Sequence, residues 1–78
     1  MRITSQDEMI DVNYDMCTLW VGDKDGEGKW KIYANTGFYG LYTLGEFPTK
    51  TAAVQELTRI YESWDRGCSN HQVRKAEG

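Results

Sequence analysis

The sequence predicts an α+β fold, a small antiparallel sheet of four or five strands with one C-terminal amphipathic helix packed on one face. Short segments rich in β-branched and aromatic residues alternate with glycine-containing turns over residues 1–47. One longer segment, residues 49–66, then spaces its apolar side chains as a helix does. Because 78 residues bury only a thin core, we expect a single domain over residues 1–67.

The expected strands lie between clear turn signals. We expect strands at residues 1–4, 9–12, 14–21, 29–34 and 38–44. Asp25-Gly26 supplies the positive φ values that a tight hairpin requires, so residues 22–28 form a reverse turn. Asn35-Thr36-Gly37 forms a second turn for the same reason.

The helix is the clearest local feature of the sequence. Thr49 is a good N-cap after Pro48, and Gly67 suits the position after the last helical residue, Arg66. Apolar residues recur at i, i+3, i+4 and i+7, which predicts that the helix packs on the sheet through Val54, Leu57, Tyr61 and Trp64. Residues 68–78 are polar and lack periodicity, so we expect a disordered tail there.

The expected strands carry more apolar surface than one helix can cover. Residues 14–21 and 38–44 place apolar side chains on both faces of the sheet. Ten of the 78 residues are aromatic, and the helix contributes only Tyr61 and Trp64. Large exposed apolar patches usually mark interfaces or ligand grooves. We therefore expect a homo-oligomer joined at least partly through the sheet face that the helix leaves uncovered.

Charge and composition exclude several classes of protein. A net charge of −3 argues against nucleic acid as the main partner. Residues 1–28 carry a net −5 and residues 29–78 a net +2, which fits solvated surface, contacts between copies, or an anion site on the later half. We find no signal-peptide core and no stretch near the ~20 apolar residues of a membrane span. We expect a cytoplasmic protein without membrane contact, with Cys17 and Cys68 reduced.

Catalytic, metal and cofactor motifs are missing from the sequence. Residues 23–27 (Asp-Lys-Asp-Gly-Glu) resemble the start of a calcium loop, but Ala34 stands where its final bidentate glutamate belongs. The single histidine, His71, lies in the polar tail, and the glycines do not form a phosphate-binding spacing. No serine or cysteine has a visible base partner. We expect no metal, no cofactor and no enzymatic activity.

A possible ligand site surrounds the second turn. The candidate ligand-binding residues are Lys31, Tyr33, Asn35, Thr36, Tyr39 and Arg59. Tyrosines can stack on a base ring, asparagine and threonine offer hydrogen-bonding groups, and a lysine or arginine can meet a phosphate. The alternative is that the turn is only a hairpin connection and that Tyr39 is an interface residue.

Both ends of the domain resemble a group of short uncharacterised proteins from Gram-positive bacteria and their phages and prophages. That group opens with an MRI-SQD…D(V/L)-YE pattern, which this chain approaches in Met1–Asp7, Asp11-Val12 and Tyr14-Asp15. Its strand-to-helix end resembles Glu46–Lys50 and Ala53…Leu57…Ile60-Tyr61. The chain departs from the pattern at Asn13, where proline is frequent, and in the longer turn at residues 22–28.

The resembled group has no assigned function, so an accessory role, in the host cytoplasm if a phage encodes the chain, is expected only by analogy of size and phage context. Short phage proteins are often counter-defence factors, and some act as sponges that hold cyclic-nucleotide signals between subunits. We therefore hypothesise a non-enzymatic, homo-oligomeric binding protein that sequesters a nucleotide-like defence signal. One alternative is a protein-interaction module that inhibits a host defence or regulatory protein directly. A small nucleic-acid-binding regulator is disfavoured by the net charge.

Overall fold

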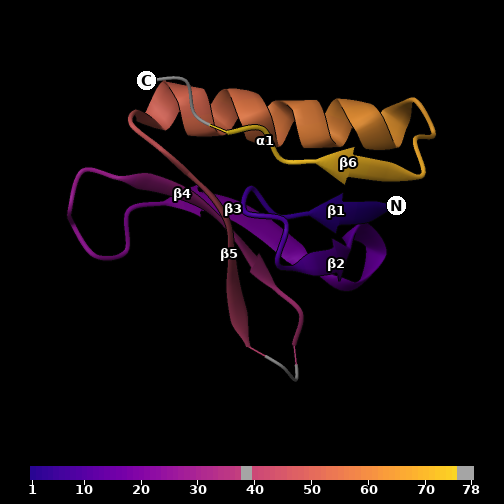
Figure 1. The fold of residues 1–78 in the computed structure, drawn as a ribbon, viewed down its shortest axis with the longest axis horizontal. Coiled ribbons are helices and arrows are strands. Elements are labelled where there is room, and N and C mark those ends of the chain that lie inside the picture. Colours follow the sequence, from indigo (N-terminus) through magenta and orange to yellow (C-terminus); the bar gives the residue numbers. More distant parts are fainter. Residues whose placement is uncertain (38–39, 76–78) are drawn as a thin grey trace.

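The computed structural model describes residues 1–37 and 40–75, and it divides the strands between two small sheets (Figure 1). The first sheet has the order β2-β1-β6, from β1 (Arg2–Thr4), β2 (Asp11–Asn13) and β6 (Asn70–Gln72). The second has the order β3-β4-β5, from β3 (Thr18–Gly22), β4 (Trp30–Asn35) and β5 (Leu41–Phe47). A 3₁₀ turn, η1 (Tyr14–Met16), precedes β3, and one helix, α1 (Lys50–Asp65), follows β5. The α+β class is confirmed, whereas the single sheet of four or five strands is replaced by two sheets of three.

Strand β6 brings the two ends of the described chain together. Strand β1 pairs antiparallel with β2 and parallel with β6, so that Ile3 lies opposite both Val12 and His71. His71 and Val73 are buried. The expectation of a disordered tail was therefore wrong for Asn70–Gln72, because the free edge of β1 offers backbone hydrogen bonds that need no apolar sequence pattern. Helix α1 is consequently followed by a strand. Residues 76–78 lie outside the described part of the chain.

Strand β4 is the centre of the second sheet and pairs antiparallel with both neighbours. The turn before it is closed by the Asp23 carboxylate, which accepts hydrogen bonds from the backbone N–H groups of Glu27 (3.1 Å) and Gly28 (2.9 Å). The strand expected at residues 14–21 begins only at Thr18. The Asn13 side chain accepts a hydrogen bond from the Asp15 N–H and caps η1, which takes the first residues of that segment.

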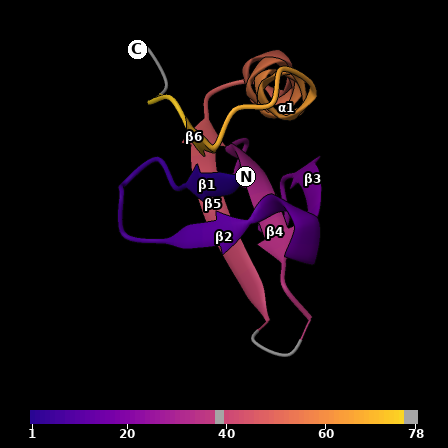
Figure 2. The same cartoon turned by 90° about the vertical axis from the view of Figure 1, so that its right-hand side faces the viewer.

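Helix α1 lies on one face of the second sheet, with β6 alongside it (Figures 1 and 2). Its ends agree with the sequence: the Thr49 hydroxyl accepts from the Ala52 N–H at 3.1 Å, and Gly67 has a φ of 75°. Its buried face differs from the prediction. The buried residues are Ala53, Glu56, Ile60 and Ser63, whereas Val54, Tyr61 and Trp64 are each about two-fifths exposed. Of the four predicted contact residues, only Leu57 is partly buried and packs against the core.

The core lies between the helix and the two sheets. Its buried apolar side chains are Ile3, Val12, Ile32, Ala34, Leu44, Phe47, Ala53, Ile60 and Val73. Within residues 1–37 and 40–75, the one helix is too short and too polar to cross a membrane.

Candidate functional site

Three of the candidate ligand residues lie on the outer face of β4. Lys31, Tyr33 and Asn35 alternate with the core residues Ile32 and Ala34, so their side chains face away from α1. The Asn35 side chain accepts a hydrogen bond from the Gly37 N–H at 2.8 Å and so closes the turn.

The remaining candidates are distributed differently. Thr36 follows β4, and its buried hydroxyl has no hydrogen-bond partner among the residues that the structure describes. Arg59 lies on α1, on the other side of the sheet, where it contacts Glu56 at 2.7 Å. Tyr39 lies outside the described residues. The structure thus brings Lys31, Tyr33, Asn35 and Thr36 to one strand and its turn, and it separates Arg59 from them.

An aromatic pair marks the middle of this outer face. Trp20 of β3 lies opposite Tyr33 of β4, with ring centroids 5.7 Å apart and ring planes inclined by 35°. Tyr33 is 4% exposed and its hydroxyl accepts a hydrogen bond from the Lys24 N–H at 3.4 Å, whereas Trp20 is 37% exposed. The ring offered to a ligand is therefore that of Trp20, which the sequence analysis did not select. The sequence did contain one sign of this position: Trp20 stands two residues after Thr18, so both side chains lie on the same face of the strand.

Lys31 provides the positive charge on this face. It lies opposite Gly22 in the register with β3, next to the Trp20–Tyr33 pair. Its ammonium nitrogen is 3.1 Å from Asp25 Oδ2, and this hydrogen bond raises the pKa of Lys31. The side chain therefore stays charged and is held at the edge of the turn.

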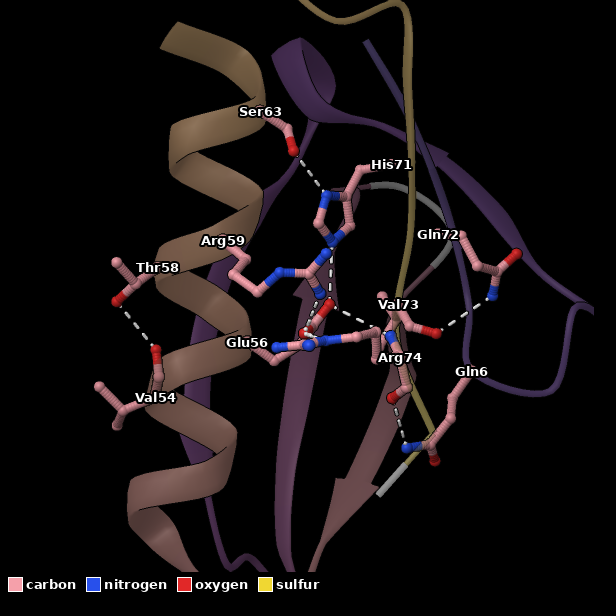
Figure 3. A network of polar contacts seen from close by, with 10 residues as sticks. All are labelled: Gln6, Val54, Glu56, Thr58, Arg59, Ser63, His71, Gln72, Val73 and Arg74. Atoms are coloured by element: carbon pink, nitrogen blue, oxygen red, sulfur yellow. Dashed lines mark hydrogen bonds and ion pairs between the residues drawn. The ribbon is translucent and has the colours of Figure 1, made fainter. Parts of the chain in front are cut away.

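A second group of polar side chains is buried between α1 and β6 (Figure 3). Glu56 is its centre: Oε2 is 2.9 Å from His71 Nε2 and 3.1 Å from the Arg74 backbone nitrogen. Oε1 accepts from Arg59 (2.7 Å) and from the Arg74 side chain (3.1 Å). Ser63 Oγ lies 2.7 Å from His71 Nδ1. Each buried member thus has a partner, which is what allows polar groups to replace apolar ones on this side of the helix.

The environment of Glu56 keeps its carboxyl group ionised. Burial alone would raise its pKa, but hydrogen bonds from His71, the Arg74 backbone, Arg59 and the Arg74 side chain lower it from 4.5 to about 2. An ionised carboxylate only accepts hydrogen bonds, so His71 Nε2 carries the proton of that contact. When His71 is neutral, its Nδ1 is then an acceptor and the Ser63 hydroxyl donates to it.

Ser63, His71 and Glu56 therefore have the hydrogen-bond order of a serine–histidine–acid group. In a hydrolase, the serine oxygen must also reach the substrate carbonyl beside an oxyanion hole. Here Ser63 and His71 are each only 6% exposed, and Ser63 lies within the helix, turned towards β6. The two arginines have already neutralised Glu56. This arrangement suits the attachment of β6 to α1 better than it suits attack on a substrate.

The sequence analysis missed this network for a definable reason. His71 was assigned to a disordered tail, and Glu56 was not among the helix residues predicted to contact the sheet. The usable sign was spacing: Ala53, Glu56, Ile60 and Ser63 follow one another at helical intervals of three and four residues.

An open groove of about 270 Å³ lies beside the network, between the start of α1 and the chain after β6. Its polar lining includes Glu56, Arg74 and Lys75. The Arg74 guanidinium already contacts Glu56, which leaves Lys75 as the lining cation without an ion pair among the described residues. One exposed lysine is a weak basis for an anion site.

A third cluster joins η1 to the end of α1. The Tyr14 ring stacks on Trp64 (centroids 4.7 Å apart, planes 19° apart) and meets Tyr61 edge-on at 6.5 Å. Met16 beside it is 70% exposed. This cluster continues the apolar side of α1 beyond the core, towards β3.

Over residues 1–37 and 40–75, no three histidine, cysteine or acidic side chains gather as metal ligands. Asp23, the first acid of the loop that resembles a calcium site, is engaged in closing its own turn. Cys17 and Cys68 are both free thiols.

Comparison with protein-family models, with curated protein sequences and with solved structures finds no match to this chain. Its function therefore has to be inferred from the geometry of these surfaces.

Proposed function

We propose that the chain is a non-enzymatic accessory binding protein of phage type that sequesters a flat, nucleotide-like ligand on the outer face of β3-β4-β5. The observation that supports this most is the partly exposed indole of Trp20, which lies beside the buried Tyr33 ring. Among the described elements, α1 occupies the opposite face of the sheet and leaves this one uncovered.

The neighbouring residues match the other parts of such a ligand. Stacking of a base on an aromatic side chain contributes about 1–3 kcal/mol. Lys31, diagonal to Trp20, carries a positive charge that a phosphate group would share with Asp25, 3.1 Å from the ammonium nitrogen. The outer face ends at Asn35, whose side chain closes the turn that follows.

Tryptophan fluorescence tests the proposal directly. The double variant Trp30→Phe/Trp64→Phe leaves Trp20 as the single indole, and titration with cyclic mono- and dinucleotides should quench it in a saturable way. The matched variant Trp20→Phe/Trp30→Phe, which retains only Trp64, should respond much less. A bound ligand should also raise the melting temperature of the unmodified protein.

Substitution of the site completes the test. Trp20→Ala should abolish the thermal shift, whereas Thr18→Ala, on the same face of the same strand, should retain it. If no nucleotide at millimolar concentration alters either the Trp20 fluorescence or the melting temperature, the proposed ligand class is wrong.

A further inference from the structure

We infer that two copies of the chain pair antiparallel through their β3 strands, about a two-fold axis at Trp20, and so form one continuous six-stranded sheet. This inference deepens the proposed function. The pairing itself does not depend on that function; only its consequence for ligand binding rests on it.

Strand β3 is an open edge that is suited to pairing. It is the outermost strand of the order β3-β4-β5, and Thr18–Gly22 contains neither a charge nor a proline. No other segment in the described parts of the chain forms a backbone hydrogen bond with its outer side. Natural edge strands are normally protected by charges, proline or a covering segment. An apolar, unprotected edge is therefore a site for another strand.

The partner that fits this edge best is a second β3. When two copies run antiparallel with Trp20 opposite Trp20, Leu19 of each lies opposite Val21 of the other. Thr18 then lies opposite Gly22. Leu19 and Val21 already pack against the core on the side of α1, so the new pairs extend an apolar layer that exists in each copy. Every pair is free of like charges, which otherwise oppose cross-strand pairing.

The exposed apolar side of α1 points towards the same edge. Val54 lies on the flank of α1 away from β6 (Figure 3), Tyr61 lies two turns further along the same side, and Trp64 stacks on Tyr14, close before β3. A single copy leaves each of these side chains about two-fifths exposed. Two sheets joined at β3 place the two helices on the same side of the joined sheet, with these flanks facing each other. The second copy thus covers an apolar stripe of α1 that lies outside the core of a single chain.

The charged residues that flank β3 do not form ion pairs in this register. Continued beyond the strand, Trp20 opposite Trp20 places Lys24 of one copy opposite Met16 of the other, and Asp15 opposite Asp25. Asp25 already lies 3.1 Å from Lys31 of its own copy, which compensates its charge. The pairing therefore rests on the apolar edge and on the exposed flank of α1.

The pairing also completes the proposed ligand site. Residues directly opposite each other in antiparallel strands have Cβ atoms about 4.5–5.5 Å apart. The two Trp20 rings therefore lie side by side on the outer face, and each copy contributes an indole to one shared stacking surface.

Light scattering and native mass spectrometry of the ligand-free full chain test the pairing. The unmodified protein should have twice the mass of one chain at micromolar concentration. Val54→Lys should give a monomer, because it places two like charges between the facing helices. Gln55→Lys, which adds the same charge one residue further along the exposed helix surface, should leave the dimer intact. A monomeric unmodified protein, or equal effects of the two lysine variants, would overturn the inference.

The two proposals fail separately. Dimerisation is measured without ligand, and nucleotide binding can be measured on the Val54→Lys monomer through Trp20. A monomer that still quenches retains the proposed function and shows that one copy is enough. A dimer that no nucleotide affects retains the pairing alone.

Discussion

Helix α1 meets different surroundings on its two flanks. On the side of β6, Glu56 and Ser63 are buried and bonded to His71, Arg59 and Arg74. On the side of β3, Tyr61 and Trp64 are apolar but two-fifths exposed. The polar flank is closed and the apolar flank is open, the reverse of what hydrophobicity alone predicts. The comparison indicates that satisfied hydrogen bonds, as well as apolar content, determine which side of a helix in a small domain is covered.

The two edges of the second sheet show the same contrast. The side-chain amide of Gln6 donates to the Glu46 carbonyl (3.1 Å) and accepts from the Glu46 N–H (3.0 Å), as a neighbouring strand would. The Gln6 backbone also donates to the Leu44 carbonyl. The β5 edge is thus occupied within the chain, whereas the β3 edge is left for an external strand.

The largest expected effect is on the closed flank. Glu56→Ala should lower the free energy of unfolding by about 3–5 kcal/mol, because it removes the acceptor of a buried charged network. Glu62→Ala, on the same helix but exposed, should change it by less than about 0.5 kcal/mol. Urea unfolding measures both. Similar effects of the two variants would mean that the network contributes little.

The same carboxylate predicts a defined loss of stability in acid. Its pKa in the folded protein is about 2, below the ordinary 4.5, so its contribution is complete above pH 4.5 and disappears as the pH falls towards 2. That contribution is on the order of 3 kcal/mol. Glu56→Gln should lack this part of the profile, so the two stability curves should converge over this window. Parallel curves would contradict the assignment.

On the open flank, the residue that still reaches the core should have an intermediate effect. Leu57→Ala should cost about 2 kcal/mol, the low end for a leucine, because the side chain is only partly buried. Val54→Ala, measured at a concentration at which the protein is monomeric, should cost less than about 0.5 kcal/mol. An equal cost for both would show that the helix is rotated differently about its axis.

The smallest effect is expected at the occupied edge of β5. Gln6→Ala should cost about 1 kcal/mol, because the backbone groups of Glu46 then bond to water instead. Gln55→Ala, an exposed glutamine on α1, is the control. The Gln6→Ala variant should also aggregate sooner on concentration if this side chain is what protects the edge.

An element could be predicted from the sequence when the signals that define it lie within its own segment, and not when it depends on a distant partner. The bounds of α1 were confirmed, because a capping threonine, helical spacing and a terminal glycine act within the segment itself. Strand β6 was missed, because the side chains of Asn70–Gln72 carry no apolar alternation and the strand exists only beside β1. The rotation of α1 was missed for the same reason, since it depends on His71, a distant residue.

The candidate ligand site was predictable only in part. The strand predicted at residues 29–34 is present as β4, which places Lys31 and Tyr33 on one face, whereas Asn35, predicted in the turn, is the last residue of the strand. The identity of the exposed ring depends on the register that pairs Trp20 with Tyr33, and the separation of Arg59 depends on its contact with Glu56. Neither relation is visible along the chain. Ligand binding at this face stays a prediction.

The parallel pairing of β1 with β6 has a consequence for the order of events during synthesis. Strand β1 is synthesised before the rest of this domain, whereas one of its two partners, residues 70–72, follows every other strand and the helix in the chain. Until then Ile3 lacks part of its cover and Glu56 lacks His71. The domain therefore completes its folding late, and β3 of a nascent chain is an open edge before residues 70–72 have been added.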